Sequence, residues 1–127
     1  MTIEHIAIYV GNLEKMKNFY ETYFGGVSNE MYHNPISGLK SYFLSFGSGA
    51  RLELMSSPKV ENDVRSLYGS GLIHMAFKVG SAKEVNNLTA RLHADGYNVL
   101  SGPRTTGDGY YESCIQDPEG NQVEITC

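Results

Sequence analysis

The chain has 127 residues, of which 41% are hydrophobic and 19% charged, a composition typical of one globular domain or of two small modules that share a core. Its formal net charge is -4 and its basic residues are scattered, so the sequence disfavours a nucleic-acid partner. Apolar runs are far shorter than the roughly 20 residues that span a bilayer, and no basic segment followed by an apolar stretch opens the chain. We therefore expect no membrane partner and a cytoplasmic location.

The first half predicts a strand, a helix and three further strands. Residues 3–10 read as a strand in which Ile6, Ile8 and Val10 share one face and His5, Ala7 and Tyr9 share the other. Asn12 is a suitable helix cap, and apolar residues at spacings of three and four predict a helix from residue 13 to the Gly25-Gly26 pair. Strand candidates follow at residues 27–33, 39–46 and 50–55, separated by Gly-, Pro- and Ser-rich turns.

The second half repeats this order after a connection at residues 57–71, where one helical turn is expected around residues 60–67. Residues 72–79 predict a strand that carries His74, and the capping-box spacing of Ser81 and Glu84 begins a helix that reaches Asp95-Gly96. Strands are expected at residues 97–100, 110–116 and 122–126, with a Gly-rich loop at 102–109 and a turn at 117–121. Two modules of the order βαβββ, residues 1–56 and 72–127, are therefore predicted. The two cysteines, Cys114 and Cys127, are interpreted as free thiols.

Two His and two Glu residues recur at matched positions in the modules. His74 follows His5 by 69 positions, and Glu124 follows Glu53 by 71. Each Glu stands between two apolar residues of a strand, so alternation places the carboxylate on the face opposite the helix, together with the His. A single His or Glu on a strand more often belongs to a solvated sheet face. Four of them, matched by the repeat, make a set of N and O donors suited to Zn, Ni, Co, Mn or Fe.

The repeated modules, the early His, the Asp117-Pro118-Glu119-Gly120-Asn121 turn and the Val-Glu-Ile that follows it resemble the vicinal oxygen chelate superfamily, which includes glyoxalase I, extradiol dioxygenases and bleomycin-resistance proteins. The resemblance covers essentially the whole chain and is closest to glyoxalase I (lactoylglutathione lyase). It implies an α+β fold in which the paired modules form a cupped, open eight-stranded mixed sheet with the helices outside. A homodimer is expected by analogy with the family.

In glyoxalase I the metal is held by His, Glu, His and Glu at strand positions that match His5, Glu53, His74 and Glu124. The resemblance thus implies a divalent cation, first Zn or Ni, with Co, Mn or Fe as alternatives. It also implies isomerisation of the thiohemiacetal of an α-oxoaldehyde through a metal-bound enediolate, with Glu124 as the base and Glu53 able to share that task. Glutathione-using members carry an Arg near Tyr9 and an Asn near Ser57, and neither is present here.

The small-molecule substrate is therefore left open, and candidate substrate residues are Tyr9, Arg51, Arg104 and Tyr110. Another metal-dependent member of the superfamily, such as an extradiol dioxygenase, an epimerase or a thiol transferase, is an alternative. The dioxygenases usually lack a carboxylate at the Glu53 position. A non-catalytic drug-binding protein is a second alternative, although the bleomycin-binding relatives lack the metal donors.

Overall fold

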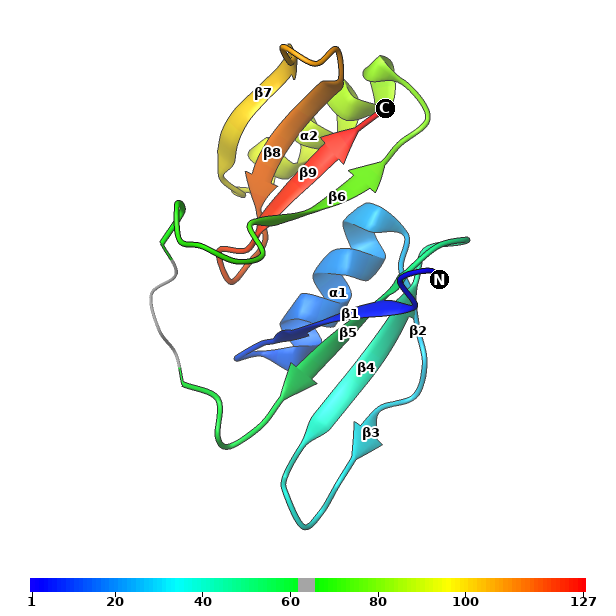
Figure 1. The fold of residues 1–127 in the computed structure, drawn as a ribbon, viewed down its shortest axis with the longest axis vertical. Helices are drawn as coiled ribbons and strands as arrows, with labels where there is room; N and C mark the ends of the chain where they lie inside the picture. The colour runs from blue at the N-terminus through cyan, green and yellow to red at the C-terminus, as the bar shows by residue number, and fades with distance from the viewer. Residues whose placement is uncertain (62–65) are drawn as a thin grey trace. The chain divides into compact units, whose positions relative to one another are not determined.

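A computed structural model of the chain describes residues 1–61 and 66–127. The chain divides into two compact units, residues 1–63 and 64–127, and each unit has one long helix packed on its own sheet (Figure 1). This α+β arrangement of two similar modules confirms the predicted fold class. No helix in the described part of the chain has the length and apolar character needed to cross a membrane.

The first unit contains one helix and one mixed sheet, whose strands β2 and β3 are short. Its elements are β1 (His5–Tyr9), α1 (Leu13–Phe24), β2 (Val27–Ser28), β3 (Tyr32–His33), β4 (Lys40–Ser45) and β5 (Arg51–Ser56). The strand order is β1-β5-β4-β2, with β3 also paired to β4. Only the β1–β5 pair is parallel, so the N-terminal strand lies beside the last strand of its own unit.

The second unit repeats this topology with β6 in the place of β1. Its elements are β6 (His74–Lys78), α2 (Ala82–Ala94), β7 (Val99–Thr105), β8 (Tyr111–Gln116) and β9 (Gln122–Thr126). The strand order is β6-β9-β8-β7, and β6 runs parallel to β9. The matching register of β1–β5 and β6–β9 is the structural counterpart of the sequence repeat.

Both helices begin and end where the sequence predicts. The side chain of Asn12 accepts a hydrogen bond from the Lys15 N–H at 3.0 Å, and Gly25 ends α1 with a left-handed φ of 66°. At the start of α2, the Ser81 hydroxyl oxygen accepts from the Glu84 N–H at 3.3 Å. These local contacts satisfy backbone groups that the helices leave free at their ends.

Alternation along the strands separates a buried face from a polar one. Leu52 and Leu54 on β5 are 3% and 0% exposed, and Val123 and Ile125 on β9 are both fully buried. They pack under the helices, where α1 buries Met16 and Tyr20 and α2 buries Val85 and Leu92. The polar residues between them, including the two Glu of the repeat, face the other side of each sheet.

Two sequence-based expectations differ in detail, and a third lies partly outside the described residues. The strand expected at residues 27–33 is split into β2 and β3. The loop expected at 102–109 is strand as far as Thr105, because β7 is an edge strand whose register shifts accommodate Gly102 and Pro103. The helical turn expected around residues 60–67 lies partly outside the described residues.

Candidate metal centre

The first His–Glu pair lies on the polar face of the first sheet. Because β1 and β5 are parallel with Ala7 opposite Glu53, His5 and Glu53 project to the same face. The Nε2 atom of His5 is 3.9 Å from Oε2 of Glu53, and the two side chains are 41% and 14% exposed. We call His5 and Glu53 the first half-site.

The second pair has the same construction on β6 and β9. Ala76 lies opposite Glu124, and Nε2 of His74 is 3.2 Å from Oε2 of Glu124. Burial raises the pKa of the Glu124 carboxyl, and the nearby His74 opposes that rise. We call His74 and Glu124 the second half-site, and its register neighbour on β8 is Cys114.

The spacing of both pairs suits ligation of a cation. With metal–N and metal–O distances near 2.1 Å and a tetrahedral angle, two donor atoms on one ion lie roughly 3.4 Å apart. The observed 3.9 Å and 3.2 Å lie on either side of this value. Within residues 1–61 and 66–127, no group of three or more His, Cys, Asp or Glu side chains gathers in a way that could hold a metal. The structure therefore presents two half-sites, each with one N and one O donor.

Arg51, a predicted substrate residue, is engaged within the first unit. Its guanidinium forms an ion pair with Glu4 and lies 4.3 Å from the centroid of the Phe43 ring. Glu4 also forms a hydrogen bond with Nδ1 of His5. This bond lowers the pKa of the Glu4 carboxyl, and the nearby Arg51 lowers it further. Sequence reasoning missed both Glu4 and Phe43. The only signal for Glu4 is its position directly before His5.

The other predicted substrate residues are exposed. Tyr9 is 52% exposed on β1, and Tyr110 is 55% exposed in the turn before β8. Arg104 lies opposite Glu112 in the β7–β8 pair, and its charge lowers the pKa of Glu124. Of these three residues, Arg104 is thus the one with an electrostatic link to a half-site. Their roles in substrate binding remain predictions.

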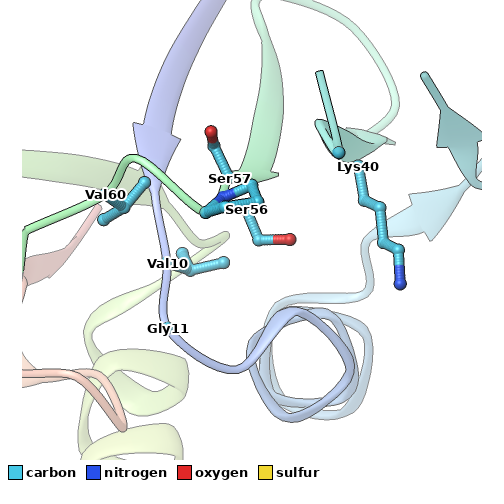
Figure 2. Close-up of a pocket in the computed structure, with 8 residues that line it drawn as sticks. Val10, Gly11, Lys40, Ser56, Ser57 and Val60 are labelled. Atoms are coloured by element: carbon cyan, nitrogen blue, oxygen red, sulfur yellow. The ribbon is translucent and has the colours of Figure 1, made fainter. Parts of the chain in front are cut away.

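A pocket of about 310 Å³ opens on the first unit (Figure 2), and neither His5 nor Glu53 lines it. Lys40 lies across it from Val10 and Val60, and Ser56 is opposite Lys40 in the β4–β5 register. Lys40 and Ser56 belong to the helix-covered face of the sheet, because each lies two residues along its strand from a buried residue, Tyr42 and Leu54. The full lining is Val10, Gly11, Gly38, Lys40, Ser56, Ser57, Pro58 and Val60.

The family model described as the glyoxalase/bleomycin resistance protein/dioxygenase superfamily matches residues 2–125. The chain belongs to this superfamily. The match covers both modules and confirms the resemblance drawn from the repeated modules, the early His and the turn with the Val-Glu-Ile that follows it. It also agrees with the observed pair of mixed sheets, each with one long helix.

The relatives named below align with nearly the whole length of this superfamily member. The uncharacterized protein YqjT of Bacillus subtilis is 29% identical over 129 residues, which cover 97% of this chain and 96% of YqjT. A glyoxalase family protein from Enterococcus faecalis has a solved structure that is 28% identical, with a TM-score of 0.77 and coverage of 98% and 96%. The trypanothione-dependent glyoxalase I of Leishmania major has the same fold, with a TM-score of 0.79 at 22% identity and coverage of 99% and 86%.

Proposed function

We propose that this superfamily member is a metal-dependent lyase or isomerase of the glyoxalase I type. Its substrate would be the thiohemiacetal that an α-oxoaldehyde such as methylglyoxal forms with a thiol. The observation that carries the proposal is the presence of two equivalent His–Glu half-sites with donor separations of 3.9 Å and 3.2 Å. In the proposal, the two half-sites together hold one divalent cation, first Zn or Ni, with Co, Mn or Fe as alternatives.

The donor set favours this function over others in the superfamily. Imidazole and carboxylate ligands suit borderline divalent ions, and four of them leave room for the substrate oxygens. The presence of Glu53 supports a set of metal ligands of the glyoxalase I type, because the extradiol dioxygenases of the superfamily usually lack a carboxylate at that position. A ligand-binding protein without catalysis would have no need for two His–Glu pairs at equivalent register.

The reaction moves one proton between neighbouring carbons of the substrate. A bound divalent cation would make the C–H beside the carbonyl more acidic. A carboxylate oxygen of Glu124 removes this proton and returns it to the adjacent carbon, and the hydroxyl proton passes from the first substrate oxygen to the second, which converts the thiohemiacetal to a hydroxy thioester. Glu53 can share this task. His5 and His74 would bind the cation as neutral ligands through Nε2, and they transfer no proton.

A homodimer is part of the proposal. Each sheet has strands at its edges, β1 and β2 in the first unit and β6 and β7 in the second, that another chain could extend or cover. The half-sites of one ion can come from one chain or from two. Mixing a His5→Ala chain with a His74→Ala chain distinguishes these arrangements, because only sharing between chains restores metal binding in the mixture.

The test starts with metal analysis of protein purified without chelator, followed by an assay with methylglyoxal and several thiols. We expect about one divalent ion per pair of half-sites, and loss of the ion and of activity in Glu53→Ala and His74→Ala. His33→Ala is the matched control, since His33 is exposed on β3 and is not part of a half-site.

Two results would contradict the proposal. A protein that turns over a catechol and keeps this activity after Glu53→Ala would be a dioxygenase. A protein that binds an apolar or aromatic compound equally well with and without metal would be a binding protein of the drug-sequestering type.

A further inference from the structure

His5 of the first half-site belongs to a closed ring of side-chain contacts with Glu4, Arg51 and Phe43. Nδ1 of His5 lies 2.5 Å from Oε2 of Glu4, and the other carboxylate oxygen of Glu4 is paired with Nη2 of Arg51. The guanidinium carbon of Arg51 lies over the Phe43 ring, 4.3 Å from its centroid, and the Phe43 and His5 rings meet edge-on with their centroids 5.3 Å apart. Each member of the ring therefore contacts two others.

The contact between Glu4 and His5 determines which imidazole nitrogen carries the proton. An ionised carboxylate only accepts hydrogen bonds, so Nδ1 of His5 must be the donor. In the neutral ring this leaves the lone pair on Nε2, the atom that faces Glu53 at 3.9 Å. A free lone pair on Nε2 is what ligation of a cation requires.

The remaining contacts keep the Glu4 carboxylate in place. The parallel register brings Arg51 opposite His5, and the Arg51 N–H donates to the backbone carbonyl of Glu4 at 2.9 Å. The guanidinium then reaches the Glu4 carboxylate, and its central carbon lies over the Phe43 ring. Although Glu4 is exposed, it is thus held by the backbone as well as by its side chain.

Among residues 1–61 and 66–127, the second half-site has no ring of contacts equivalent to this one. The residue before His74 is Ile73, whose side chain has no acceptor for Nδ1. Gln122 takes the register place of Arg51, and its amide N–H donates to the Leu67 carbonyl at 3.2 Å. Cys114 takes the place of Phe43 beside the Glu of its module. The two half-sites are therefore matched in their donors and different in their supports.

We infer that Glu4 is a positioning residue, which, with Arg51 and Phe43 behind it, holds His5 in the Nδ1–H tautomer with Nε2 directed toward the cation. The inference rests on the proposed function, and it assigns the first half-site as the preorganised one. Outer carboxylates that accept from a ligating His typically change metal affinity by about 10–100-fold when removed. The same assignment gives Arg51 a supporting role in place of direct substrate binding.

The experiment measures Zn²⁺ affinity by competition with a chromophoric chelator, and the tautomer of His5 by NMR of the ¹⁵N-labelled, metal-free protein. Glu4→Ala should weaken Zn²⁺ binding about 10–100-fold and shift His5 away from the Nδ1–H tautomer. Glu4→Gln keeps an acceptor without the charge, so its loss should be smaller. Glu30→Ala is the matched control, because Glu30 is exposed in the same unit and should leave both readouts unchanged.

The outcomes separate the two proposals. If the wild-type chain fails to bind Zn²⁺ and the other divalent ions, the proposed function fails and the inference fails with it. If the wild type binds and Glu4→Ala binds with equal affinity, or His5 keeps its tautomer in that variant, the inference alone is overturned. Circular dichroism of each variant excludes misfolding as the cause of a loss.

Discussion

Thr89 of α2 and Ser113 of β8 form a buried hydrogen bond that joins the helix to the sheet of the second unit. Their hydroxyl oxygens are 2.6 Å apart, and the two residues are 4% and 0% exposed. The Thr89 hydroxyl also donates to the Val85 carbonyl at 2.6 Å. Because a hydroxyl has a single proton, Ser113 must be the donor in the bond to Thr89.

This direction predicts unequal costs for two conservative substitutions. Thr89→Val keeps the side-chain shape but leaves the buried Ser113 O–H without its acceptor, so it should lower the free energy of unfolding by about 1–3 kcal/mol. Ser113→Ala removes the donor while Thr89 keeps its bond to Val85, so the loss should be nearer 0.5–1.5 kcal/mol. In the double variant, apolar groups replace both hydroxyls, so no buried O–H is left without an acceptor. Its loss in the free energy of unfolding should therefore be smaller than the sum of the losses in the two single variants.

Urea unfolding followed by circular dichroism measures these differences. All variants are compared at one protein concentration, because the stability of an oligomer depends on it. The reasoning is refuted if Ser113→Ala costs as much as Thr89→Val, since the donor assignment would then be wrong. Strict additivity in the double variant would show that the two hydroxyls are not coupled.

Two further predictions concern a surface carboxylate and a glycine. The Tyr42 hydroxyl donates to the Glu14 carboxylate at 2.6 Å and lowers the pKa of that carboxyl below its ordinary value of 4.5. The hydrogen bond therefore stabilises the fold fully at pH values above 4.5, and this stabilisation is lost as the pH falls through the lowered pKa of Glu14. Tyr42→Phe should therefore lower the melting temperature more at neutral pH than in acid, and an equal loss at every pH would contradict this. Gly102→Ala should destabilise by more than the roughly 1–2 kcal/mol of a left-handed residue, because φ is 78° and the new Cβ would lie 2.5 Å from the Glu112 carbonyl oxygen. Gly107→Ala is the matched control, as its Cβ meets open space, and similar unfolding midpoints for the two variants would refute the argument.

The candidate donors could be found in the sequence because they lie within regular strands. Alternation fixes the face of a strand residue, so a Glu between two apolar residues must project away from the buried side. This reasoning places Glu53 with His5 and Glu124 with His74 before any coordinates are known, and the measured distances within each unit agree with it. Their role as metal ligands is a prediction that metal analysis tests.

Local chemistry and periodicity also determine the helices. Asn12 and Ser81 accept hydrogen bonds from backbone groups three residues later, and such contacts require no distant partner. The extent of β7 was not predictable in this way. Gly102 and Pro103 are typical of a loop, and only pairing with β8 makes this segment a strand.

The tertiary structure alone decided what supports His5. Alternation along the strand expected at residues 3–10 would place Glu4 on the face of Ile6, opposite to His5, but β1 begins at His5, and Arg51 is 47 residues away along the chain. Parallel pairing of β1 with β5 brings them together, because register is set by the packing of the whole sheet. The sequence by itself thus determined the elements, their buried faces and the pairs of candidate donors. The contacts that orient those donors depend on residues that only the folded sheet makes neighbours.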